Sequence, residues 1–273
     1  SDLAQDQLFT LAQQVLMGVA GSAKAFGGSA IGLQVQASTD MDLKGKGAAS
    51  IQFLRDGGRL GGVQTGGTNP LAAAASKIDQ GDIAKWLADN TSAAMIAGLQ
   101  QSDLPKRFAD FFSSVDAFKL SGEQAQAMLT AAANVKTLTD VLAPLGSVFG
   151  QLGSLSVEAT LGLAQLTGGF DQLISKSNAY VQAFYSDQEQ TSIAATQVQK
   201  ALKDAGIDTS MLTDKASFRA AVDATGSIIG SSAGQQQLAA YLNVAQQFAA
   251  IADKFGGLSL VQVAAAAPQD ALL

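Results

Sequence analysis

The spacing of apolar residues changes along the chain, and this change limits the folds that the chain can adopt. From about residue 71 onward, apolar side chains recur three and four positions apart, as they do on one face of an α-helix. From Ile31 to Ala37 they alternate with polar residues, which is the period of a β-strand. The sequence therefore predicts a mainly α fold, with a multi-helix C-terminal part that follows a small antiparallel β meander at about residues 30–65.

These patterns divide the chain into four segments. The first is a helix, for which Gly21 is the expected stop signal. The last is a tail with no expected regular structure, and an edge strand paired with a partner is the alternative for it. The segments are an N-terminal helix over 1–25, a glycine-rich antiparallel β segment over 26–70, a helical domain over 71–257 and a C-terminal tail over 258–273. Further strands are expected at residues 50–54 and 60–65, with a hairpin turn at Asp56-Gly57.

Serines that precede three of the expected helices predict N-terminal caps. A serine at the cap accepts a hydrogen bond from a backbone N–H of the first turn, and a Glu or Gln three residues later can return one. An acidic residue in the first turn also meets the positive end of the helix dipole. The expected capping residues are Ser121 with Gln124, Ser156 with Glu158, and Ser186 with Glu189.

Aromatic residues are scarce, and helical spacing places most of them on apolar faces. Tyr180, Phe184 and Tyr185 fall at this spacing with Val181, so the sequence predicts that they complete the buried face of a helix that ends before Ser186. The only tryptophan, Trp86, lies beside Leu87 on another amphipathic segment. The expected core or interface anchors are Trp86, Phe111, Phe112, Tyr180, Phe184, Tyr185, Tyr241 and Phe248.

Composition argues against most enzymatic chemistry. The chain has no histidine and no cysteine, so the commonest general base, the usual nucleophile–base pairs, ordinary zinc ligand sets and disulfides are all absent. Each of the three glutamates has a simpler interpretation, in the first turn of a helix. We therefore expect no catalytic, cofactor-binding or metal-binding residues.

Charge and surface composition favour contact with other proteins. The net charge is −6 and the four arginines are scattered, so no basic stripe is present to neutralise nucleic-acid phosphates. The chain has 28 glutamines against three glutamates, so its helix surfaces are polar but neutral, and its 50 alanines let helices approach closely. Such faces suit packing against neighbouring subunits, including further copies of the chain.

Two further segments and the start of the chain bear on function. The run "GKGAAS" at 45–50 lacks the spacing of a phosphate-binding loop and is interpreted as a flexible hairpin turn. The apolar stretch at 15–33 is broken by Lys24 and glycines, which argues against stable membrane insertion. The chain begins at Ser1 without a basic region, so we expect no signal peptide and consider it a candidate piece of a longer polypeptide.

From about Asp79 onward the sequence resembles the C-terminal region of tape measure proteins from long-tailed, siphovirus-type bacteriophages. One part of the resemblance lies in "TSAAMIAGLQQSDLPKRFADFFSSVD", "EQAQAMLTAAANVKTL" and "LSVEATLGLAQLTGGFDQL". The other lies in "YVQAFYSDQEQTSIAATQVQKALKDAGI", "DKASFRAAVDA" and "AYLNVAQQFAAIAD", and "FYSDQEQ" is its most distinctive string. The run "ATGSIIGSSAGQQQ" departs from the family pattern, which puts a helix there in doubt.

The resemblance implies a structural role in the virion rather than catalysis. Tape measure proteins set tail length during assembly, occupy the tail lumen, and hold their C-termini in the tail tip, near distal tail and hub proteins, until DNA ejection. It further implies a few copies, commonly a homotrimer, made in the cytoplasm of the host bacterium. A neutral or acidic surface fits a lumen through which DNA slides.

Two alternatives belong to other functional classes. A cell-wall-degrading module requires a carboxylate whose surroundings raise its pKa, and none of the glutamates has such a sequence context. A membrane-active module has only residues 15–33 and the alanine-rich C-terminal tail as candidate segments.

Overall fold

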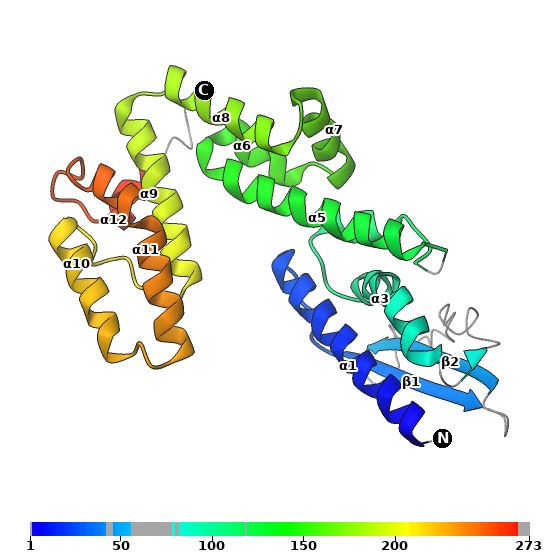
Figure 1. Cartoon of the computed structure of the whole chain (residues 1–273). Coiled ribbons are helices and arrows are strands. Elements are labelled where there is room, and N and C mark those ends of the chain that lie inside the picture. The colour runs from blue at the N-terminus through cyan, green and yellow to red at the C-terminus, as the bar shows by residue number, and fades with distance from the viewer. Residues whose placement is uncertain (1, 42–45, 56–77, 80–81, 118, 267–273) are drawn as a thin grey trace. The chain divides into compact units, whose positions relative to one another are not determined.

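The computed structural model describes residues 2–41, 46–55, 78–79, 82–117 and 119–266. It is mostly helical with a small antiparallel sheet near the N-terminus, which confirms the predicted fold class (Figure 1). The chain forms two compact units, and boundaries between them fall within helices α5 (Gly122–Leu142) and α7 (Val157–Thr167). Unit 1 comprises Ser1–Thr137 with Ser154–Leu163, and unit 2 comprises Leu138–Gly153 with Ala164–Leu273. The helical segment expected over 71–257 is thus shared between both units.

Unit 1 begins with a long helix whose apolar stripe is buried. Helix α1 runs through Gly21, so the expected stop at that residue is wrong. It ends where Gly27 adopts a φ of 84°, a left-handed conformation that suits glycine, and the Gly28 amide donates to the Ala23 carbonyl. The buried side chains of the stripe are Leu8, Ala12, Val15, Val19 and Ala23.

Three strands form the sheet, and the first of them packs against α1. Strand β1 (Leu33–Met41) pairs antiparallel with β2 (Lys46–Arg55), with Val35 opposite Phe53, and the two-residue β3 (Ile78–Asp79) pairs with the start of β2. Leu33, Ile51 and Phe53 are buried, whereas Val35 and Ala37 are half-buried. The strand expected at 50–54 is therefore confirmed as part of β2.

Other expectations for the β segment were wrong or lie outside the described residues. Ile31 precedes β1 and is 87% exposed, because the chain turns at Gly32, whose φ is 81°. Lys46–Ser50, expected in a flexible turn, belongs to β2. The expected strand at 60–65 and the Asp56-Gly57 turn lie outside the described residues.

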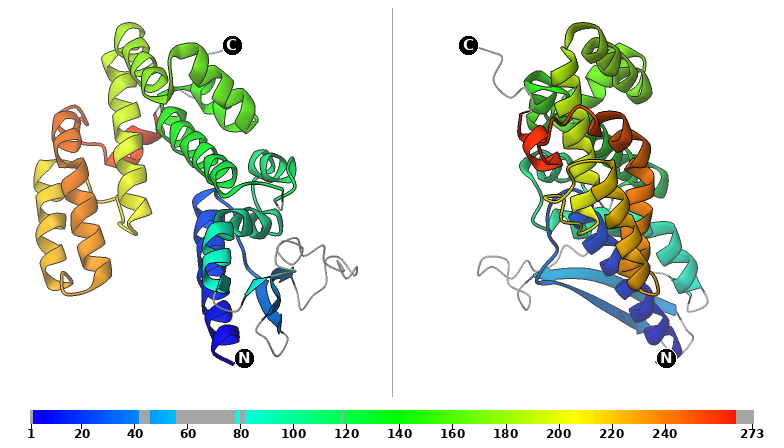
Figure 2. Two further views of the ribbon diagram at one scale, coloured as in Figure 1. Left: turned by 45° about the vertical axis from the view of Figure 1, so that its right-hand side comes forward. Right: turned by 90° about the vertical axis from the view of Figure 1, so that its left-hand side faces the viewer.

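Helices α3 and α4 complete the core of unit 1. Helix α3 runs beside α1 (Figure 2), and Gly98 lies at their closest approach, where a Cβ atom would come within 2.5 Å of Val19 Cγ2. From α4, Phe112 is fully buried and Phe111 nearly so, which confirms both as core anchors. The described helices of this unit are α1 (Asp2–Ala25), α3 (Ile83–Gln100), α4 (Lys106–Ser113) and the first parts of α5 (Gly122–Leu142) and α7 (Val157–Thr167).

A short clamp joins the end of α1 to the start of α4. The Ser29 amide donates to the Asp103 carbonyl at 2.8 Å, and the Asp103 amide donates back to Ser29 at 2.9 Å. Gly28 lies so close to the Asp103 backbone that a Cβ atom would overlap the carbonyl. The clamp therefore requires glycine at position 28.

The predicted helix caps differ in which of their hydrogen bonds are present. Ser121 and Gln124 exchange two hydrogen bonds at 3.0 and 3.1 Å, so the capping box of α5 is present. Ser156 Oγ accepts from the Ala159 amide at 3.1 Å, whereas Glu158 only adds an acidic group to the first turn of α7. Asp82 stands at the N-cap of α3, but its side chain accepts no cap hydrogen bond. Trp86 is half-buried on α3, and its indole N–H has no hydrogen-bond partner among the described residues.

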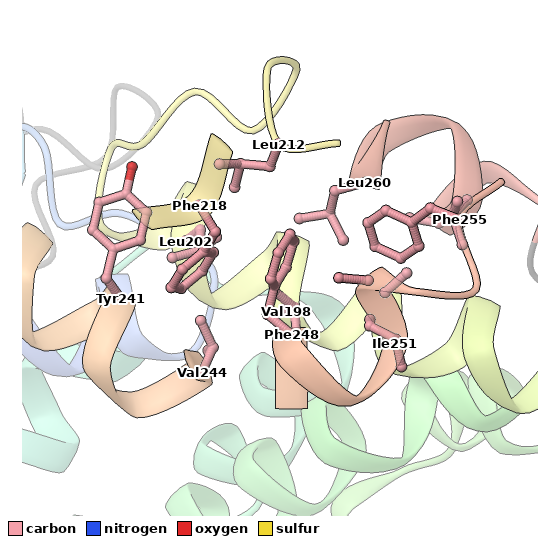
Figure 3. Close-up of a cluster of buried hydrophobic side chains, with 14 of the residues drawn as sticks. Val198, Leu202, Leu212, Phe218, Tyr241, Val244, Phe248, Ile251, Phe255 and Leu260 are labelled. Atoms are coloured by element: carbon pink, nitrogen blue, oxygen red, sulfur yellow. The ribbon is translucent and has the colours of Figure 1, made fainter. Parts of the chain in front are cut away.

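Unit 2 is a helical assembly with one large apolar cluster (Figure 3). Phe248 is 1% exposed, and its ring stacks on Phe218 at 4.5 Å between centroids, while Tyr241 meets Phe218 edge-on at 5.4 Å. Tyr241 and Phe248 are thus core anchors. The described elements of this unit are the last parts of α5 and α7, with η2 (Ala143–Leu145), α6 (Ser147–Gly150), η3 (Gln151–Ser154), α8 (Phe170–Phe184), α9 (Asp187–Asp204), α10 (Lys215–Ala224), η4 (Thr225–Ser227), α11 (Ser232–Ala252) and α12 (Leu260–Ala265).

The C-terminal tail is not irregular throughout. Residues 260–265 form α12, so the expectation of no regular structure is wrong for them. Ser259 and Gln262 form a capping box, and Leu260 is fully buried in the apolar cluster. The run "ATGSIIGSSAGQQQ" contains η4, the turn between α10 and α11, and the first residues of α11.

Candidate functional site

The junction between α8 and α9 presents aromatic rings that the sequence placed in the core. Tyr180 is 47% exposed and Phe184 is 74% exposed, so the prediction that they finish a buried face is wrong. The buried side of α8 is a narrow stripe of Leu173, Ser177 and Val181. Successive residues turn by about 100° around a helix, so Tyr180 and Phe184 point within about 20° of the direction of Leu173. Their exposure therefore arises because no described element covers this face near the C-terminal end of α8, and not from their angular position on the helix.

Four rings from two helices and one linker gather at this junction. Tyr180 lies 4.9 Å from Phe184, 6.1 Å from Tyr185 and 6.2 Å from Phe149 of α6, measured between ring centroids. These separations fall in the range of favourable aromatic pairs. We call Phe149, Tyr180, Phe184 and Tyr185 the aromatic surface.

Tyr185 is the fixed member of the aromatic surface. Gly146, with a φ of 132°, lies so close that an added Cβ atom would be 2.5 Å from Tyr185 Oη. The main-chain carbonyl of Tyr185 accepts from Gln190 Nε2 at 2.8 Å, which ties the backbone of this residue to the start of α9. Burial raises the pKa of the Tyr185 hydroxyl above its ordinary value. Its phenol is therefore neutral at physiological pH.

A capping box sets the direction in which the chain leaves these rings. Ser186 donates from both N and Oγ to Glu189 Oε2 at 2.7 Å, and its Oγ accepts from the Glu189 amide at 3.3 Å. The hydrogen bonds from Ser186 lower the pKa of Glu189. A general acid for glycoside cleavage needs the opposite shift. Glu189 therefore acts as a helix cap.

The aromatic surface is suited to binding a partner by burying apolar area, rather than to making or breaking covalent bonds. Its four side chains are uncharged, and two of them are largely exposed. Covering an exposed Phe is worth about 1.5–3 kcal/mol, and exposed apolar groups that gather in one place mark interaction sites. Val148, 57% exposed on α6, extends the apolar character of this region.

Two cavities flank α12, and no sequence pattern predicts either of them. One, of about 620 Å³, lies between η2–α6 and the pair α9–α12, with Gln199 and Ala265 in its lining. The other, of about 280 Å³, is bordered by the first turn of α9 and by Phe255, Leu258 and Val263. They arise where small residues leave the sides of α12 uncovered.

Within the part of the chain that the structure describes, no three His, Cys, Asp or Glu side chains are grouped so that they could hold a metal ion. None of the described helices has the length and apolar character needed to span a bilayer. Comparison with known proteins found no matching family model, curated protein or solved structure.

Proposed function

We propose that this chain is the C-terminal part of a phage tail tape measure protein. In this role it is a structural virion protein that helps to set tail length, docks at the distal tail tip and is released when DNA is ejected. The proposal is supported by the sequence resemblance, which is most distinctive at "FYSDQEQ", residues 184–190. The same residues begin at the exposed ring of Phe184 and include the capping box of α9.

The observation that carries the proposal is the exposure of the aromatic surface. Aromatic residues are enriched where proteins meet, because they bury much area with few rotatable bonds. Tyr180 and Phe184 stand on a regular helix, and Tyr185 is held by Gly146, so the rings are pre-organised for a partner. A distal tail or hub protein is the proposed partner, and self-association of this chain as a trimer is proposed beside it.

The cell-wall-degrading alternative has weaker support. The pKa of Glu189 is lowered by its hydrogen bonds to Ser186, whereas a catalytic acid needs a raised pKa. A zymogram of the purified protein tests this alternative directly. Clearing that disappears in Glu189→Gln would favour it over the structural role.

Peptide mapping of purified particles tests the proposal itself. Tails of the phage that encodes this chain are expected to contain its peptides, at a few copies per tail. Tails that are complete and infectious without any such peptide would contradict the proposal. Light scattering of the purified chain should give three times the chain mass.

A matched pair of variants tests the aromatic surface. Tyr180→Ser with Phe184→Ser should reduce the incorporation of the chain into tails, because the rings no longer bury apolar area against the partner. Leu242→Ser on α11 is the control, since Leu242 is also exposed, at 62%, but lies outside the aromatic surface. Circular dichroism must show that both proteins are folded, and equal incorporation of both would remove the aromatic surface from the proposal.

A further inference from the structure

Helix α12 is held mainly by one neighbour. It packs on α9, and Leu260 points into the apolar cluster that α9 lines (Figure 3). The Leu260 amide donates to the Leu212 carbonyl at 2.7 Å, and Thr196 Oγ1 of α9 donates to the Ala264 carbonyl at 3.3 Å. These contacts define a seat on α9 that accepts a short helix in one orientation.

Two sides of α12 border cavities. Val261, Ala264 and Ala265 border the 620 Å³ cavity, and Val263 and Ala266 border the 280 Å³ cavity. Atoms that face a cavity lose the dispersion contacts that a packed neighbour would supply. Helix α12 is therefore stabilised mainly by its packing against α9 and the apolar cluster.

The connection to α12 is a glycine hinge. Phe255 is buried at its start, and Gly256 and Gly257 follow with φ values of 60° and 88°. A Cβ atom on either glycine would meet nothing within 4 Å, so packing does not impose the bend. The Leu258 amide donates to the Phe255 carbonyl at 3.1 Å and closes the turn. Opened, residues 256–258 would span about 10 Å.

We propose that α12 exchanges between copies, so that the α12 of one chain occupies the seat on α9 of a second copy. Each seat then keeps the same buried leucine and the same two hydrogen bonds, and only the turn at the hinge opens. An exchange that preserves its contacts has a small free-energy cost and is promoted by concentration. This inference rests on the proposed self-association and gives it a structural basis.

Chains that carry single cysteines test the exchange, because the natural sequence has no cysteine. Gln199→Cys on α9 and Ala265→Cys on α12 border the same cavity, and neither side chain is buried. The two variants are mixed at high concentration and treated with a short thiol-reactive crosslinker. Exchange predicts a mixed covalent dimer, several-fold above the yield for the control mixture of Gln199→Cys with Leu242→Cys.

Variants of the hinge provide a second, independent test. Deleting Gly256 and Gly257 prevents α12 from folding back and should shift the population toward oligomers. Inserting Gly-Ser-Gly-Ser after Gly257 should shift it toward monomers. The mass distribution is measured by light scattering on proteins whose helical content matches that of the unmodified chain.

The outcomes distinguish the exchange of α12 from the self-association on which it rests. An oligomer that yields no mixed crosslink above the control, and that is unchanged by both hinge variants, overturns the exchange and leaves self-association intact. A monomer at every concentration overturns both.

Discussion

Unit 2 contains two groups of aromatic rings with similar ring spacing and opposite exposure. Phe218, Tyr241, Phe248 and Phe255 have neighbouring centroids 4.5–5.6 Å apart and are all buried. In the aromatic surface the neighbouring centroids are 4.9–6.2 Å apart, yet Tyr180 and Phe184 are largely exposed. Helical spacing thus shows which residues share a face, and the coverage of that face depends on the elements that pack there.

The buried group is enclosed because several elements meet around it. Residues of α9, α10, α11 and α12 all contribute to its cluster. Around Tyr180 the neighbouring rings come only from α8, the residue after it and the short α6. The aromatic surface therefore presents exposed rings, whereas the rings of the buried group are enclosed.

The largest expected effect comes from truncating the buried group. Phe248→Ala should lower the free energy of unfolding by about 3–5 kcal/mol, because it removes a ring from a closed cluster. Phe184→Ala is the matched control and should change that free energy by less than about 0.5 kcal/mol. Urea denaturation followed by circular dichroism measures both. Equal losses for the two variants would break the comparison between the groups.

A smaller loss of stability is expected from a substitution at Gly146, which lies against Tyr185 of the aromatic surface. Gly146→Ala should lower the free energy of unfolding by about 1–3 kcal/mol from backbone strain, with a further loss from contact with Tyr185 Oη. Gly169→Ala isolates the strain, since Gly169 also has a positive φ, of 112°, but open space around it. Thermal melts of both variants should give Gly146→Ala the lower melting temperature. When Tyr185→Phe is combined with Gly146→Ala, it should restore part of the difference in melting temperature from Gly169→Ala. No restoration would mean that the hydroxyl does not anchor the ring.

The cap behind the exposed rings should contribute less. Ser186→Ala removes the acceptor for the Glu189 amide and should destabilise the unit by about 1 kcal/mol. Ser175→Ala, in the exposed middle of α8, is the control and should have almost no effect. The midpoints of urea denaturation give the difference. If the two variants unfold alike, the cap does not stabilise the junction.

The smallest effect is a pH dependence at the same cap. The folded-state pKa of Glu189 is lowered below its unfolded value by the bonds from Ser186. Its contribution is therefore present above the unfolded pKa, about 4.3, and is lost as the pH falls through the lower folded value. Melting temperatures of the natural chain and Glu189→Gln should converge as the pH falls from 7 through this range. A constant difference between them would contradict the assignment.

Local signals in the sequence predicted much of the structure. The reciprocal caps Ser121–Gln124 and Ser186–Glu189 were predictable because both partners lie within one turn. The end of α9 was also predictable, since Gly206 has a φ of 74° and Ile207 is buried beside it. The helices and the hairpin follow in the same way from residues that are neighbours in sequence.

The features that the sequence did not reveal depend on distant contacts. Residues 260–265 form a segment of six residues with two β-branched valines, so the helical signal is weak alone, but the seat on α9 stabilises α12. The exposure of Tyr180 depends on the absence of a helix over it, which no local pattern encodes. Gly21 resembled a stop signal, yet a glycine ends a helix only where the chain needs a left-handed residue.

The clamp between Ser29 and Asp103 also bears on the order in which the chain folds. The hydrogen bonds at Ser29 join residues that are far apart in sequence, and the ends of such a loop meet slowly because closing it loses entropy. On the ribosome, α1 emerges long before Asp103 does. During that interval its stripe of Leu8, Val15 and Val19 has no α3 to cover it. The nascent N-terminal helix is therefore expected to be a chaperone-binding segment until residue 103 has left the exit tunnel.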